Sequence, residues 1–252
     1  QRIKPFFISL LGNVFEWYDF MVYAALAPII ANVFFPAQNG VNALLETYGI
    51  FAIGFLSRPF GALLFGFLGD RFGRRYALLL AISLMTVPTL FIGSLPSYAT
   101  ADLLAPCALL VLRLIQGLAL SGEMPGCILF LSEMAPKRFQ TTIASLAIVA
   151  SLMGLLLATH GVWWLNAHFG EQALQSGLWR IPFLIAGILG FVIYYLRRDL
   201  PETRAFLNQS QPITQPIRTC LRHHWRPILQ GIGCYAGNAI YFYFLMVFSL
   251  TY

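Results

Sequence analysis

Five ionisable side chains lie well inside long apolar stretches of this 252-residue chain: Glu16, Asp19, Arg58, Arg113 and Glu123. If these stretches cross a membrane, a charge near the centre costs at least ~2.5 to 3.5 kcal/mol on insertion scales. Residues kept there at such a cost usually mark a path for protons, ions or polar solutes. The five side chains therefore predict a site that handles charge inside an apolar protein.

Two helical faces would hold most of these side chains. In the first apolar stretch, Glu16 and Asp19 are three residues apart, so they share one face of an α-helix. In the fourth stretch, Arg113, Gln116 and Glu123 also share a face, with Arg113 and Glu123 about 15 Å apart along the axis. The fourth helix is therefore predicted to carry a polar stripe through much of its depth.

The interior charges do not balance, because three carboxylates face two guanidiniums. Arg197, at the end of the sixth stretch, is grouped here with the basic residues outside the membrane. Glu16 and Arg58 should each lie roughly 15 to 17 Å from the cytoplasmic end of their helices, which makes them expected partners. Burial favours the protonated form of the uncompensated carboxyl, and a proton-coupled carrier requires such a group. The alternative is a satisfied buried network that only locks the helices together.

The composition explains which elements position these residues. With 58% hydrophobic and 10% charged residues, the chain has too little polar surface for a soluble globule. About 20 apolar residues in a helix cross a bilayer. We therefore predict an all-α membrane protein with seven spans near residues 5–34, 44–68, 76–95, 103–132, 140–166, 178–197 and 227–252.

Basic residues are concentrated on one side of these spans. Of the 16 Lys and Arg residues, 13 fall in the N-terminus, in the turns near residues 71–75 and 137–138, or in the stretch 197–226. The positive-inside rule places these segments, and the N-terminus with them, in the cytoplasm. The net charge of +6 is thus a sign of topology, and binding to nucleic acid is not indicated.

A polar stretch divides the chain into predicted domains. Residues 1–198 form a six-helix transmembrane domain, residues 199–226 a cytoplasmic linker, and residues 227–252 a seventh transmembrane helix that begins a mostly absent second domain. Because the chain starts at Gln1 and stops in an apolar run at Tyr252, we expect it to be a piece of a longer protein.

The most densely charged turn runs from Gly66 to Arg75 and reads Gly-Phe-Leu-Gly-Asp-Arg-Phe-Gly-Arg-Arg. Its shortness forces the flanking helices into an antiparallel hairpin, and Gly73 can supply the tight bend. The turn resembles the cytoplasmic loop motif of the major facilitator superfamily, G-x-x-x-D-R-x-G-R-R, at every specified position. Arg113, Gln116 and Gly117 resemble the fourth-helix motif of the same superfamily.

Further stretches resemble the metabolite:proton symporter family, which includes carriers of proline and betaine, α-ketoglutarate, citrate and shikimate. They are residues 12–20, 57–61, 122–123, 133–136, 179–183 and 202–203. Two positions depart from the family pattern. Ser121 replaces the first Gly of a Gly-Gly-Glu sequence, and Gln140 stands in a loop where a basic pair is usually followed by Gly.

The resemblance implies a twelve-helix proton symporter of bacterial inner membranes, built from three-plus-three helix repeats, with its sites between two six-helix domains. It assigns six residues to the substrate and proton-coupling network: Glu16, Asp19, Arg58, Arg113, Gln116 and Glu123. It assigns six more to a cytoplasmic gate, with Asp70 as an electrostatic latch: Gly66, Asp70, Arg71, Gly73, Arg74 and Arg75.

We therefore expect proton-coupled symport of a small organic acid or zwitterionic solute by alternating access. Arg113 would contact the solute carboxylate or modulate a neighbouring carboxyl, while Glu16, Asp19 or Glu123 carries the proton. We expect no enzyme motif, catalytic residue, metal-ligand cluster or cofactor. Protons are the expected coupling ion. The expected partners are the solute, the lipid bilayer and the missing six-helix domain. The alternative is a truncated, non-transporting remnant or assembly domain, and a channel fits less well because the gate-type turn suits rocking domains better.

Overall fold

The computed structural model describes residues 4–35, 40–208, 222 and 225–251, and every regular element among them is a helix. The chain divides into two compact units, Gln1–Gln211 and Pro212–Tyr252. Helix α12 (Trp225–Thr251) belongs to the second unit, and its assignment as a seventh transmembrane helix stays a prediction. Most of the predicted linker lies outside the described residues, and its boundaries stay a prediction.

The first predicted span is broken rather than continuous. It consists of α1 (Lys4–Ala25) and α2 (Ala27–Phe34), which meet at Leu26 with a bend of 62°. Pro28 occupies the first turn of α2. Proline has no N–H to donate to the preceding turn and its ring clashes with the carbonyl four residues earlier, so a continuous helix is interrupted just before it.

The second predicted span contains a similar interruption. It is formed by α3 (Gly40–Leu56) and α4 (Arg58–Phe72), with Ser57 between them and Pro59 in the first turn of α4. The hydroxyl of Ser57 donates to the carbonyl of Gly54 at 2.7 Å. The carbonyl of Gly54, next to the interruption, thus has a donor inside the protein, as an apolar environment requires.

The remaining spans of the first unit are α5 (Arg74–Ser94), α7 (Leu104–Met134), α8 (Gln140–Ala173) and α9 (Arg180–Arg197). Short helices join them: α6 (Tyr98–Ala101), η1 (Lys137–Phe139) and η2 (Leu174–Leu178), and α10 (Arg204–Leu207) follows α9. Among the described residues, five helices are long and apolar enough to cross a membrane, or six with the bent pair α1 and α2 counted as one span. The six predicted spans of this unit are therefore confirmed.

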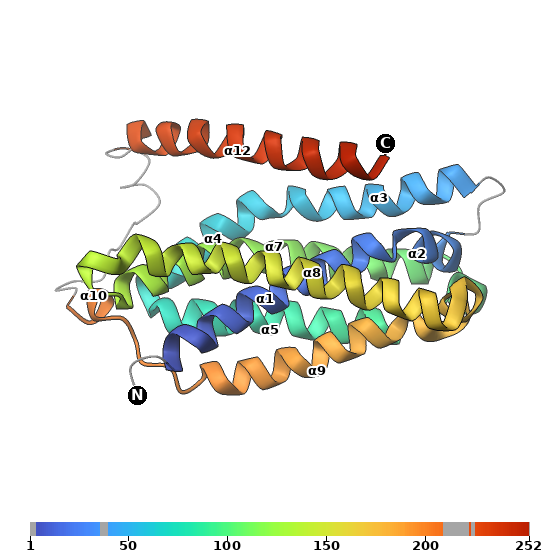
Figure 1. Cartoon of the computed structure of the whole chain (residues 1–252), viewed down its shortest axis with the longest axis horizontal. Coiled ribbons are helices and arrows are strands. Elements are labelled where there is room, and N and C mark those ends of the chain that lie inside the picture. The colour runs from blue at the N-terminus through green and yellow to red at the C-terminus, as the bar shows by residue number, and fades with distance from the viewer. Residues whose placement is uncertain (1–3, 36–39, 209–221, 223–224, 252) are drawn as a thin grey trace. The chain divides into compact units, whose positions relative to one another are not determined.

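Helices α1 and α7 are the elements that bring the polar faces together. Helix α7 contacts α1, α3, α4, α5 and α8, while α1 also packs on α8 and α9. Glycines allow this close packing, since a Cβ at Gly117 would collide with the carbonyl of Gly54, and one at Gly154 with the backbone of Val14 and Tyr18. Within this unit the start of α1 and the helix α10 lie at the same end of the helices (Figure 1).

Candidate functional site

A buried polar cluster joins α1, α5 and α7 around the carboxylate of Asp19. Gln116 donates to one oxygen of Asp19 at 2.8 Å, and the hydroxyl of Thr89 donates to the other at 2.9 Å. The guanidinium of Arg113 lies 4.0 Å from Asp19 and 3.8 Å from the ring centroid of Tyr23. The structure thus brings together three predicted site residues, Asp19, Arg113 and Gln116, and adds Thr89.

This Asp19 cluster keeps hydrogen-bonding capacity in reserve. Arg113 is 4% exposed, yet its Nε and Nη2 groups have no hydrogen-bond acceptor among the described residues. The side-chain oxygen of Gln116 likewise receives no donor there. A buried guanidinium with open donors costs free energy unless something else accepts them, and a carboxylate matches its geometry best.

A second buried cluster is built around an ion pair between Arg197 on α9 and Glu123 on α7. Both side chains are 0% exposed. Arg197 donates from Nη1 to one carboxylate oxygen of Glu123 at 2.6 Å and from Nη2 to the other. The same two nitrogens donate to the carbonyls of Ser9 at 2.9 Å and Leu78 at 3.4 Å. One guanidinium therefore ties together α1, α5, α7 and α9.

Gly12 on α1 makes room for this ion pair. A Cβ placed on Gly12 would collide with the guanidinium of Arg197 and would lie 2.6 Å from Oε1 of Glu123. Because real Cβ atoms essentially never approach so closely, only glycine fits against the pair. Glu16 follows one helical turn later on the same face of α1.

The expected partnership between Glu16 and Arg58 is not formed as an ion pair. Glu16 is 2% exposed, and its Oε2 has no hydrogen-bond partner among the described residues. The guanidinium of Arg58 instead lies over the rings of Phe55 and Phe20, at 4.2 and 5.4 Å from their centroids. Matching depth along two helices did not bring these two charged groups within 4.0 Å of each other, because rotation about each axis also decides which side chains meet.

The charge count of the interior changes because one more cation is buried. Arg197 was grouped with residues outside the membrane because it ends its helix, but it is fully buried. Among the described residues, the buried carboxylates of Glu16, Asp19 and Glu123 therefore accompany the buried guanidiniums of Arg113 and Arg197, and Arg58 is half-buried. In the sequence, Glu123 lies inside its span with no basic residue within one helical turn. This was the signal that could have indicated a cation from another helix, such as Arg197.

The charged turn after α4 is held inside this unit by a chain of polar contacts. The φ of Gly73 is +103°, which confirms the predicted tight bend between α4 and α5. Arg74 pairs with Asp70 at 2.6 Å and with Glu133, at the end of α7, at 3.3 Å. Asp70 thus engages Arg74 within the same unit.

Glu202 closes the same turn from the segment after α9. Its carboxylate accepts from the backbone N–H groups of Arg74 at 3.0 Å and Arg75 at 3.2 Å, at the N-terminus of α5. The guanidinium of Arg75 donates in turn to the carbonyl of Arg198. A carboxylate at this position satisfies free amide groups and complements the helix dipole.

Not every residue assigned to the gate joins these contacts. Arg71 is exposed, with its guanidinium 5.5 Å from the ring centroids of Phe67 and Phe72. A Cβ on Gly66 would meet nothing within 4 Å, so no contact of the structure requires glycine there. Glu133 and Glu202 were noted only as parts of family-like motifs, and their partners depend on tertiary contacts that spacing does not reveal.

The described part of the chain contains no group of three or more His, Cys, Asp or Glu side chains able to hold a metal ion.

Comparison with known proteins gives the clearest indication of the class of protein in which the two buried clusters occur. The family model described as sugar (and other) transporter matches residues 5–222.

Several curated proteins are similar over nearly the whole chain. The chain is 35% identical to the proline/betaine transporter of Salmonella typhimurium, covering 99% of this chain and 52% of that protein. It is 37% identical to the citrate-proton symporter of Salmonella typhi, covering 96% and 56%, and 36% identical to the alpha-ketoglutarate permease of Escherichia coli, covering 100% and 58%. The chain therefore spans about half the length of these relatives.

Solved structures show the same fold at lower sequence identity. The xylose transporter XylE of E. coli, in a partially occluded inward-open conformation, matches with a TM-score of 0.73 and 20% identity over 82% of this chain and 51% of that one. A second structure, of the major facilitator superfamily proton:xylose symporter XylE, also matches with a TM-score of 0.73. The chain is a multi-pass membrane protein with the fold of the N-terminal half of such a carrier. It belongs to the sugar (and other) transporter family of the major facilitator superfamily, whose members are transporters and not enzymes.

Proposed function

We propose that this chain supplies the N-terminal half of a proton-coupled symporter for a small carboxylate-bearing or zwitterionic solute. The observation that carries the proposal is the buried Arg113, which is 4% exposed and keeps two donor groups without an acceptor. The names of three relatives point to the same class of solute, because proline, betaine, citrate and alpha-ketoglutarate all carry a carboxylate.

Arg113 is the proposed contact for that carboxylate. Its Nε and Nη2 donors can face a carboxylate in the side-by-side geometry that guanidinium groups favour. Asp19 holds Arg113 from the other side at 4.0 Å, and Gln116 adds an amide oxygen suited to an ammonium or hydroxyl group. A solute carboxylate would therefore share the positive charge of Arg113 with Asp19.

That sharing supports a route for coupling. When the solute carboxylate also pairs with Arg113, a second negative charge lies near Asp19, and binding a proton becomes more favourable for this buried carboxyl. Glu16, with one oxygen lacking a donor, is the second proposed proton carrier. Glu123 is the weakest of the three, because both of its oxygens are held by Arg197.

In this proposal the turn after α4 is the cytoplasmic gate, and a second six-helix domain supplies the opposite wall of the cavity. Contacts among Arg74, Asp70, Glu133 and Glu202 keep the turn rigid within the first domain. The proposed location is the bacterial inner membrane with the N-terminus in the cytoplasm. The second candidate function is a non-transporting remnant or assembly domain, since alternating access needs two walls and this chain spans about half of its relatives.

Reconstitution into proteoliposomes tests the proposal. Uptake of radiolabelled proline, glycine betaine, citrate and α-ketoglutarate is measured with and without an inward proton gradient, with protein-free vesicles as the blank. Gradient-stimulated uptake of any of the four supports symport. Solute binding without uptake favours a half-carrier that needs its second domain, and neither binding nor uptake favours the non-transporting alternative.

A further inference from the structure

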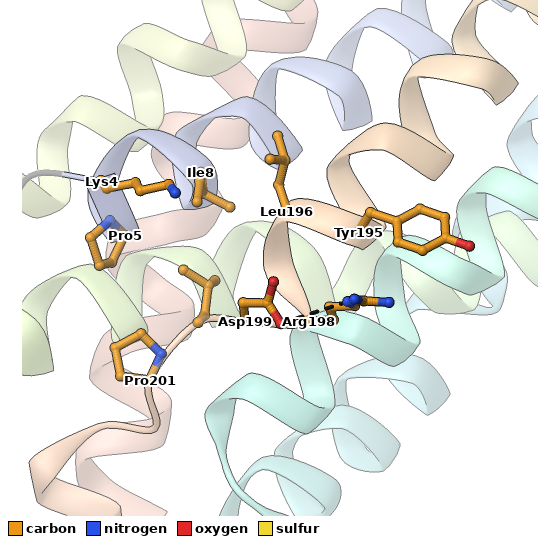
Figure 2. A pocket seen from close by; sticks show the side chains of 9 residues that line it. Lys4, Pro5, Ile8, Tyr195, Leu196, Arg198, Asp199 and Pro201 are labelled. Atoms are coloured by element: carbon orange, nitrogen blue, oxygen red, sulfur yellow. Dashed lines mark ion pairs between the residues drawn. The ribbon is translucent and has the colours of Figure 1, made fainter. Parts of the chain in front are cut away.

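A pocket of about 460 Å³ opens where the first and last spans of the helical unit end together. Its walls come from the start of α1 and from the end of α9 with the four residues that follow (Figure 2). The pocket lies outside both buried clusters, and neither the proposed transport nor the comparisons use it.

Charged and polar groups form the rim of this pocket. Lys4 comes from α1, while Arg198 and Asp199 follow α9. In the view of Figure 2, Lys4 and Arg198 lie on either side of Asp199, and a dashed line joins Asp199 to Arg198. The separation is 3.6 Å, and the two side chains are 56% and 80% exposed. Two cations and one carboxylate leave a rim charge of plus one.

A further cation holds the rim in place. The guanidinium of Arg75, from the start of α5, donates to the carbonyl of Arg198. This contact fixes the backbone at Arg198 and adds positive charge beside the pocket. The electrostatic potential of the rim therefore favours an anion over a cation.

The floor of the pocket is apolar. Ile8 and Leu200 are buried, with exposed fractions of 7% and 2%. Leu196 and Tyr195 also line the pocket and are 38% and 59% exposed. The arginine Arg198 lies 5.2 Å from the ring centroid of Tyr195. A soluble anion needs only the rim, whereas a molecule with a charged head and an alkyl body can use both the rim and the floor.

We propose that this pocket binds an anionic phospholipid of the leaflet that faces the N-terminus. Lys4 and Arg198 donate to the phosphate oxygens, and Ile8, Leu196 and Leu200 pack against the glycerol backbone and the first methylene groups. The pocket lies where two spans reach the membrane surface, and lipid headgroups contact a membrane protein at that level. Basic pockets between helices at that level suit anionic headgroups. Each cation should contribute about fivefold to the affinity, from about 1 kcal/mol per basic residue near an anionic surface.

Native mass spectrometry of the purified chain in detergent tests the proposal with dioleoyl-phosphatidylglycerol as the probe. Dioleoyl-phosphatidylcholine serves as the zwitterionic comparison and glycerol phosphate as the soluble one. We expect phosphatidylglycerol to bind with a Kd lower than that of phosphatidylcholine, and glycerol phosphate not to displace it. In the double variant K4Q/R198Q, binding should weaken by roughly 25-fold.

Two further variants keep the test decisive. Lys137→Gln removes one exposed cation outside the pocket and should change the Kd less than about twofold, since it leaves the rim intact. Asp199→Asn removes the only carboxylate that lines the pocket, among the described residues, and should strengthen binding. Equal helix content by circular dichroism and equal elution on size exclusion establish that each variant is folded.

Several results would overturn the proposal. An unchanged Kd in K4Q/R198Q removes the pocket from consideration, and a loss of about fivefold in K137Q, the loss expected for one rim cation, means general attraction to a basic surface. Displacement by glycerol phosphate assigns the rim to soluble phosphate esters. Weaker binding in D199N points to a headgroup whose amine needs the carboxylate, which is a zwitterionic lipid. None of these outcomes depends on whether the chain transports a solute.

Discussion

Arg197 and Glu123 form a side-by-side ion pair that has no exposed surface and joins α9 to α7. The guanidinium also donates to carbonyls of α1 and α5, so four helices share one cation. Most of its hydrogen-bonding capacity is used within the protein, in contrast to Arg113, whose Nε and Nη2 groups have no acceptor among the described residues. We therefore assign the two buried arginines different tasks: Arg197 holds helices together, and Arg113 is the proposed contact for the solute.

Replacing Arg197 by Gln should destabilise the helical unit strongly. The change leaves the carboxylate of Glu123 buried without its cation, and breaking such a pair costs about 3 to 5 kcal/mol. Thermal unfolding in detergent, followed by tryptophan fluorescence, measures the effect. Arg198→Gln is the matched control, since the side chain of Arg198 is 56% exposed and its replacement should cost little stability. Equal midpoints for R197Q and R198Q would contradict the structural role of the pair.

Gly12→Ala should destabilise the protein although alanine normally favours a helix. The added methyl group would collide with Arg197 and Glu123, and overpacking of this kind costs about 1 to 3 kcal/mol. Gly49→Ala is the control, because a Cβ on Gly49 meets nothing within 4 Å and the change should gain up to about 1 kcal/mol. The same unfolding assay compares them, and a gain in both variants would show that α1 does not press on the ion pair.

Glu202→Ala should loosen the start of α5. The carboxylate accepts from the N–H groups of Arg74 and Arg75, and the loss of such a cap costs about 1 kcal/mol. Hydrogen exchange by mass spectrometry should show faster exchange in the peptide that spans Gly73 to Ala77. Glu171→Ala, a change to an exposed carboxylate at the end of α8, is the control. Unchanged exchange at the start of α5 would mean that Glu202 does not hold the turn.

Arg113→Lys should weaken solute binding at least tenfold while the fold survives. Lysine keeps the positive charge near Asp19 but loses the flat pair of donors that suits a carboxylate, a difference of about 1.4 kcal/mol or more. Isothermal titration with the four solutes named above measures the loss. Arg180→Lys, at the opposite end of the spans from the basic turns, should bind as the unchanged protein does. Equal affinity in R113K would remove Arg113 from the proposed solute site.

The spans could be predicted from the sequence because apolar length alone determines them. The interruptions at Leu26 and Ser57 were missed, although Pro28 and Pro59 are the signals that could have indicated them, and the 62° angle at Leu26 depends on how α2 packs. The bend at Gly73 was also predictable, since a ten-residue charged turn between two spans needs a residue that tolerates positive φ.

The site was only partly predictable. Side chains on one helical face, such as Arg113 and Gln116, follow from periodicity, and the structure brings both to Asp19. Pairing between helices does not follow, because it depends on rotation and on close packing at glycines such as Gly12. For this reason the estimated depth of a residue along its helix did not reveal that Glu123 pairs with Arg197. For the same reason it did not reveal that the guanidinium of Arg58 lies over an aromatic ring and forms no ion pair with Glu16.

Proton uptake on solute binding tests the proposed coupling most directly. Isothermal titration of the purified chain, repeated in two buffers with different ionisation enthalpies, gives the number of protons taken up per solute bound. We predict about one proton for at least one of the four solutes, because a symporter binds proton and solute cooperatively. The value should fall to near zero in Asp19→Asn if Asp19 is the carrier, or in Glu16→Gln if Glu16 is. Binding with no proton uptake in the unchanged chain, or no binding of any of the four solutes, would contradict proton-coupled symport at this site.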